Sequence, residues 1–222
     1  MTVEEEPPAF HLTEVDRAVL AQTDEEFIYH DWKDLQDIIA RGDLGILKRK
    51  PSDLLRYLQW TKETKAQYGT ITNYICLRRL KWELPREPEA DGTPAPPSPP
   101  AFHNPIPFAD PADYKILRND WPYGLAKGIS HLVVWSRTPI PVKDSDGVIT
   151  DESHALIEEF VQRTFVARLA NDKESSRLFP DPKSHVLWFK NYTALQSVRG
   201  LEHVHVLLRE VPDRLLHEWT SE

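Results

Sequence analysis

The sequence predicts an α+β fold, in which an antiparallel sheet with one crossover helix follows a helical region. Hydrophobic residues recur with helical spacing in the first third of the chain, ten prolines fall within residues 85–111, and short strand-like runs flank a single amphipathic helix after them. We therefore divide the chain into an N-terminal helical subdomain at 1–84, a proline-rich linker or strap at 85–110, and an α+β domain at 111–222.

Three short helices are expected before the prolines. The first covers 31–40, where apolar residues fall on one face, and Gly42 is a plausible stop. The second opens at Ser52 and ends at Gly69. The third covers 70–82, although its β-branched and aromatic residues also suit a strand.

The proline-rich segment separates these helices from the sheet. Proline has no backbone N–H and favours extended polyproline geometry, so neither a helix nor a central strand can run through 85–110. A connector is the simpler interpretation, and a ligand for a proline-recognition domain is the alternative.

Four strand-like runs and one helix follow the prolines. In chain order they are strands at 114–117 and 129–135, a helix at 151–170, and strands at 185–189 and 201–208. The short connections within each pair of strands permit hairpins, and only one crossover helix is available, which favours an antiparallel sheet.

Charge and composition limit the partners. Among the 222 residues, 35 acidic side chains against 27 basic ones give a net charge of −8, which disfavours binding to nucleic acid. No stretch approaches the ~20 apolar residues of a membrane span. The single cysteine, Cys76, lies between apolar neighbours and is expected to be buried, and a lone thiol suits a reducing compartment. We expect a cytoplasmic protein that binds neither nucleic acid nor membrane.

Two histidines on the last predicted strand are the strongest candidates for catalytic residues. His203 and His205 are one residue apart, so their imidazoles point to the same side about 7 Å apart along the strand. A free imidazole nitrogen can attack phosphorus, and Gln196 and Ser197 just before the strand can bind phosphate oxygens without net positive charge. These residues predict a site for a small phosphorylated metabolite. A two-histidine metal pair and ordinary sheet histidines are the alternatives.

The same stretch resembles the histidine-triad (HIT) superfamily of nucleotide hydrolases and transferases. The resemblance rests on Gln196-Ser197-Val198 followed by His203-Val204-His205-Val206-Leu207, with Asn191 on the preceding strand and 121–137 similar to the earlier strand. It implies a HIT-like sheet in which His203 is the nucleophile and His205 orients it or exchanges a proton. Gln196 and Ser197 would hold phosphate oxygens, and Asn191 would bind sugar or phosphate.

The first position of the triad is occupied by Leu201, whose side chain cannot form a hydrogen bond. A binding module that has lost catalysis is therefore the alternative to a hydrolase or transferase acting on a nucleotide or sugar nucleotide. A cytosolic interaction scaffold that uses the helical part and the proline strap is a third hypothesis. Many HIT proteins are dimers through strand addition, and the extra helices here could block that edge, so a monomer is favoured over a homodimer.

Over most of its length the chain is similar to the fungal N-acetylglucosamine-induced protein family. The matching segments are 53–60 with Tyr68-Gly69, 119–124, 131–135, 188–191 and 196–205. The family name reports a sugar response in expression and implies no reaction.

Other polar residues near these motifs are candidate contacts with alternatives. His131 is a site residue or a hydrogen-bonded structural histidine, and Asp120 with Trp121 forms either a wall for a base or sugar or simply a turn. Arg199 and Lys190 could balance a phosphate, or they are surface charges. The sequence predicts no metal site and no cofactor.

Overall fold

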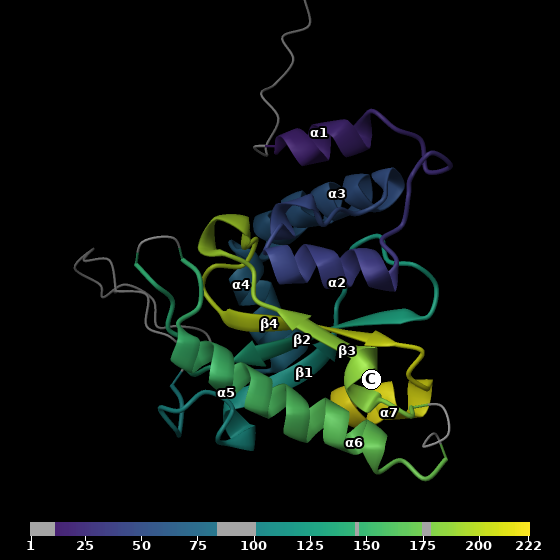
Figure 1. The fold of residues 1–222 in the computed structure, drawn as a ribbon. Helices are drawn as coiled ribbons and strands as arrows, with labels where there is room; N and C mark the ends of the chain where they lie inside the picture. The colour runs from purple at the N-terminus through teal and green to yellow at the C-terminus, as the bar shows by residue number, and fades with distance from the viewer. Residues whose placement is uncertain (1–11, 84–100, 145–146, 175–178) are drawn as a thin grey trace, which may run out of the picture.

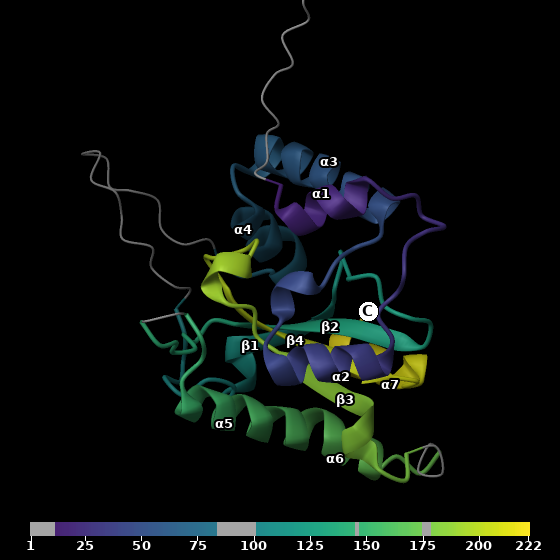
Figure 2. The same cartoon turned by 45° about the horizontal axis from the view of Figure 1, so that its top comes forward.

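A computed structural model describes residues 12–83, 101–144, 147–174 and 179–222, and shows one antiparallel sheet with helices on both faces (Figures 1 and 2). Its four strands are β1 (Tyr114–Arg118), β2 (Ile129–Ser136), β3 (Val186–Phe189) and β4 (Glu202–Arg209). Their order is β1-β2-β4-β3, so β2 and β4 form the centre.

The register of the central pair decides which side chains share a face. Val133 lies opposite His205, and Trp135 lies opposite His203. Because side chains alternate along a strand, both histidines project from one face, while Val204 and Val206 project from the other. The predicted sharing of a face by the two histidines is confirmed.

The face that bears Val204 and Val206 packs on the main core. It is covered by α5 (Asp151–Val161), which continues through η4 (Gln162–Val166) into α6 (Ala167–Ala170), and by α7 (Asp213–Thr220). Phe108, from the segment after the prolines, enters this core with its ring 4.5 Å from that of Phe160. A fully buried Phe contributes ~1.5–3 kcal/mol, so the contact fixes this segment against the helices.

The histidine-bearing face is covered by the N-terminal helices. They are α1 (Glu14–Leu20), α2 (Trp32–Arg41), α3 (Pro51–Tyr68) and α4 (Ile71–Tyr74), the last continuing into η2 (Ile75–Leu80). Helix α2 packs over Phe189 and Leu207, while α4 and η2 pack over Leu117, Val133 and Trp135. The helices therefore share two apolar clusters with the sheet.

The predicted helices and strands are confirmed, and the segment predicted at 70–82 is helical over α4 and η2 rather than extended. Helix α2 begins with a capping box at Asp31 and ends at Gly42, whose φ of 74° favours glycine. Cys76 is buried, and burial raises the pKa of its thiol. The prolines of 84–100 lie outside the described residues. In the described part of the chain, the helices are too short or too polar to cross a membrane.

Candidate functional site

A cavity of about 280 Å³ lies between the histidine-bearing face and the N-terminal helices. Its sheet side includes Trp135, His203 and His205. Aromatic side chains line another part of it, and the rings of Tyr57, Trp60 and Trp121 have centroids within 6.0 Å of one another. Three arginines also line it: Arg49, Arg79 and Arg118. A mainly apolar hollow with a few polar groups is typical of a small-molecule site.

His203 is held in one tautomer. Its Nδ1 lies 2.9 Å from the backbone oxygen of Leu201, and a carbonyl can only accept a hydrogen bond. Nδ1 therefore carries the proton, and in the neutral ring Nε2 keeps its lone pair. The side chain is only 5% exposed, and this burial lowers the pKa of His203 to about 4. The ring is therefore neutral at pH 7.

His205 and His131 form a buried pair behind His203. Nε2 of His131 lies 2.9 Å from Nδ1 of His205, so one ring donates an N–H to the other. Burial lowers the pKa of His131 to about 3, and burial together with the neighbouring His131 lowers the pKa of His205 well below its usual value. Both rings are neutral at pH 7.

Asn191 completes this network. Its Nδ2 lies 3.3 Å from Nε2 of His205 and 3.2 Å from the hydroxyl of Tyr123. Its Oδ1 is buried and has no hydrogen-bond partner among the described residues. A buried acceptor without a partner costs ~1–3 kcal/mol, so a ligand donor that reached it would gain a hydrogen bond that the protein alone does not make.

The structure brings together six of the nine residues predicted from the sequence. His203, His205, Asn191, Ser197, Asp120 and Trp121 all line the cavity. His131 lies behind His205 rather than on the cavity surface. Gln196 donates from Nε2 to the backbone oxygen of Asn191 at 2.9 Å, which positions that residue from the loop before β4.

The charged candidates are differently placed. Arg199 is exposed and is not among the residues that line the cavity. Lys190 is buried and paired with Glu202 at 3.1 Å, so it is not a surface charge. Asp120 is paired with Arg79 at 2.8 Å, which gives its carboxylate a structural role at the cavity wall.

Sequence reasoning missed the contribution of the N-terminal helical region. Arg49 precedes α3, and its guanidinium carbon lies 4.1 Å from the centroid of Tyr57. Trp60, whose helical spacing within α3 is typical of a packing residue, lines the cavity beside Trp121. The basic run of residues 48–50 was the available signal for Arg49, but basic runs are usually solvated.

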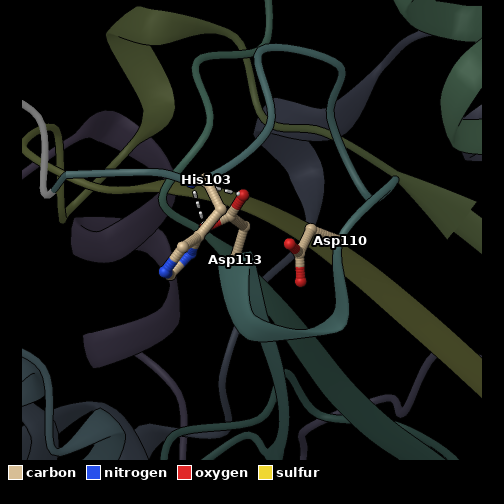
Figure 3. Close-up of side chains that lie close together, drawn as sticks. All are labelled: His103, Asp110 and Asp113. Atoms are coloured by element: carbon tan, nitrogen blue, oxygen red, sulfur yellow. Dashed lines mark hydrogen bonds and ion pairs between the residues drawn. The ribbon is translucent and has the colours of Figure 1, made fainter.

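One group of metal-ligating side chains occurs in the described part of the chain, away from this cavity. His103, Asp110 and Asp113 have ligand atoms within 4.8 Å of one another (Figure 3). The carboxylate of Asp113 already accepts the backbone N–H groups of His103 and Asn104, at 2.9 and 2.8 Å, and contacts Nδ1 of His103. These bonds explain the buried carboxylate as the anchor of the loop before β1.

Hydrogen bonds to the ring nitrogens also disfavour a metal site formed by His203 and His205. His205 uses both ring nitrogens in hydrogen bonds, and His203 uses Nδ1. Only Nε2 of His203 is left to bind a ligand.

Comparisons with known proteins identify relatives. The chain is 31% identical over 198 residues to N-acetylglucosamine-induced protein 1 of Candida albicans, covering 86% of this chain and 72% of that protein. It is 30% identical over 177 residues to the Saccharomyces cerevisiae protein named Uncharacterized protein YPL067C, covering 80% and 77%. The resemblance to the N-acetylglucosamine-induced protein family is confirmed.

A solved structure titled "Crystal Structure of HTC1" is similar in fold, with a TM-score of 0.56 and 27% sequence identity over 86% of this chain and 88% of that one. Residues 31–209 match the family described as Protein of unknown function (DUF3605). This match spans the helices over the cavity as well as the sheet beneath it, and the chain belongs to the DUF3605 family.

Proposed function

We propose that the cavity binds a nucleotide or sugar nucleotide and that Nε2 of His203 attacks its phosphorus, so that the protein is a phosphoryl or nucleotidyl hydrolase or transferase. The bond from Nδ1 of His203 to the Leu201 carbonyl is the observation that carries this proposal. It supports an orientation of the His203 ring in which Nε2 is unprotonated and makes no hydrogen bond to the described part of the protein. A neutral imidazole is nucleophilic without first losing a proton, and the lowered pKa of His203 keeps it neutral at pH 7.

The proposal retains the resemblance to the HIT superfamily. Leu201 stands at the first position of the triad, but its backbone oxygen makes the contact that orients His203. A hydrophobic side chain at this position therefore leaves that contact intact. The side chain itself is buried in the apolar cluster with Val133 and Trp135.

The proposed reaction has two steps, in which a P–N bond to His203 forms and then breaks. In the first, the lone pair of His203 Nε2 forms a P–N bond while the bond from phosphorus to the leaving oxygen breaks. The leaving oxygen keeps the electron pair of the broken bond and takes a proton from solvent water, because His205 and His131 are both neutral. In the second step, water or an acceptor hydroxyl attacks phosphorus, the electron pair of the P–N bond returns to Nε2 of His203, and the attacking oxygen releases its proton to solvent.

Turnover of a nucleotide and sugar-nucleotide panel, followed by ³¹P NMR, tests this mechanism. His203→Ala should abolish product formation while circular dichroism shows an intact fold. His154→Ala is the matched control, since His154 is exposed and lies on α5. Hydrolysis that continues unchanged in His203→Ala would remove this residue from the mechanism.

A binding module without catalysis is the second candidate function. The observation that favours it is that His205 uses both nitrogens in hydrogen bonds and is only 7% exposed, which limits its exchange of protons with a ligand. Such a module would hold a nucleotide or amino-sugar metabolite, in keeping with the name of the Candida albicans relative. Thermal stabilisation by a ligand that yields no product would distinguish it from the enzyme.

A further inference from the structure

We infer that Arg49, supplied by the N-terminal helical region, binds the phosphate of the ligand and holds it beside His203 and His205. The inference rests on the cavity being the ligand site of the proposed function. Arg49 lies outside the histidine motif. The ligand site would therefore be formed by residues of the sheet together with the segment before α3.

The three arginines of the cavity differ in their partners. Arg79 is paired with Asp120 and Glu222, at 2.8 and 2.5 Å. Arg118 is paired with Asp213 at 2.5 Å. Arg49 has no acidic partner among the described residues: its Nε donates to the backbone oxygen of Trp121 at 3.1 Å. It is therefore the arginine of this cavity whose charge is left for an anion.

The guanidinium of Arg49 is held in place by aromatic rings. Its central carbon lies 4.1 Å from the ring centroid of Tyr57 and 5.5 Å from that of Tyr123. A single bond through Nε leaves the terminal nitrogens, which have no partner among the described residues, for a bidentate contact with phosphate. The carboxylates that line the cavity are already engaged, Asp16 with Thr13 and Asp120 with Arg79.

Tyr123 connects this cation to the histidines. Its ring is stacked on His131 with centroids 5.4 Å apart, and its hydroxyl meets Asn191. The charge of Arg49 contributes to the lowered pKa values of His131 and His205, which supports its proximity to both. An anion on Arg49 would thus lie close to His205, whose ring centroid is 5.4 Å from that of the nucleophile His203.

Asn191 gives an independent indication of a ligand. Its side chain is 6% exposed, lines the cavity, and has an unpartnered buried oxygen in the described structure. That oxygen needs a donor, which a sugar hydroxyl next to a phosphate provides. With the rings of Tyr57, Trp60 and Trp121 in the same cavity, the combination of donor, anion and planar group favours a nucleoside monophosphate unit.

The inference is tested by calorimetric titration with adenosine 5′-monophosphate, with adenosine as the ligand control. Arg49→Gln should weaken binding of the monophosphate ~10–100-fold, the usual loss of a charged hydrogen bond, and leave adenosine binding unchanged. Arg49→Lys should be intermediate, because it keeps the charge and loses the planar fork. Arg118→Gln, whose cation is already paired, should bind like the wild type.

Equal effects of Arg49→Gln and Arg118→Gln would overturn the inference, as would wild-type protein that fails to bind millimolar monophosphate. If Arg49→Gln does not fold, the test rests on Arg49→Lys. An Arg49→Lys variant with the wild-type affinity for the monophosphate would then contradict the inference. Failure of the proposed function gives a different pattern: monophosphate binding that depends on Arg49, with no product from the substrate panel. His154→Ala, at an exposed position of α5 outside the cavity, should retain the binding.

Discussion

Lowering the pH from 7 to 5 should destabilise this protein through its buried histidines. The pKa of His203 is about 4 in the folded state, against the 6.5 expected of an exposed histidine. Between these values the unfolded state binds more protons than the native state, so stability rises with pH. The contribution of neutral His203 to the free energy of unfolding is complete above pH 6.5, the pKa of the histidine in the unfolded chain. It is lost as the pH falls from 6.5 towards 4.

The size of the effect follows from the two pKa values. Once the unfolded histidine is protonated and the native one is not, each pH unit costs ~1.4 kcal/mol, and integration from pH 7 to pH 5 gives about 2 kcal/mol for His203. His131 and His205 add in the same direction, because burial lowers the pKa of both. The sum is a large part of the ~5–15 kcal/mol by which a domain is usually stable.

Urea unfolding followed by tryptophan fluorescence at pH 7, 6 and 5 measures this loss. His203→Asn, which does not titrate, should reduce the loss between pH 7 and pH 5 by about 2 kcal/mol. His154→Gln is the control, since that side chain is exposed. If the stability of His203→Asn fell with pH as steeply as that of the wild type, His203 would not be a buried neutral histidine, and the reasoning would be refuted.

Three further predictions concern single residues. Leu201→Ala should cost ~2–5 kcal/mol of unfolding free energy in urea titrations, because the side chain is buried, while turnover persists through the unchanged carbonyl. Asp113→Ala should cost ~1–3 kcal/mol for each backbone donor left unpaired, and EDTA should not change the melting temperature of the wild type. Gly42→Ala should lower the melting temperature, because φ is 74° and a methyl group would meet the Tyr192 hydroxyl that donates to the Gly42 carbonyl. A melting temperature for Gly42→Ala equal to that of the wild type, a metal-dependent melt, or loss of turnover in folded Leu201→Ala would each contradict the corresponding prediction.

Much of the fold could be predicted because its signals are local. The helix at 151–170 has an apolar stripe, and α2 has a cap at each end, in Asp31 and Gly42. The two short helices missed by the sequence analysis lack a long apolar stripe. Helix α1 buries only Val19 beneath a capping box, and α7 has eight residues, too few for a clear period.

The sequence could predict only those parts of the site whose side chains lie on a single strand. The period of two places His203 and His205 on one face without knowledge of the partner strand. The contact between His131 and His205 depends on the register of β2 against β4, and these residues are 74 positions apart. The role of Leu201 was hidden because its backbone, rather than its side chain, makes the contact.

The protonation of the His203 ring at pH 7 tests the central claim most directly. Long-range ¹H–¹⁵N correlation spectra of histidine-labelled protein distinguish the two neutral tautomers from the imidazolium, with His203→Asn used to assign the signal. We predict a neutral ring with the proton on Nδ1 and a bare Nε2. A proton on Nε2, or a charged ring, would leave no nucleophilic nitrogen for the cavity and would contradict the proposed chemistry.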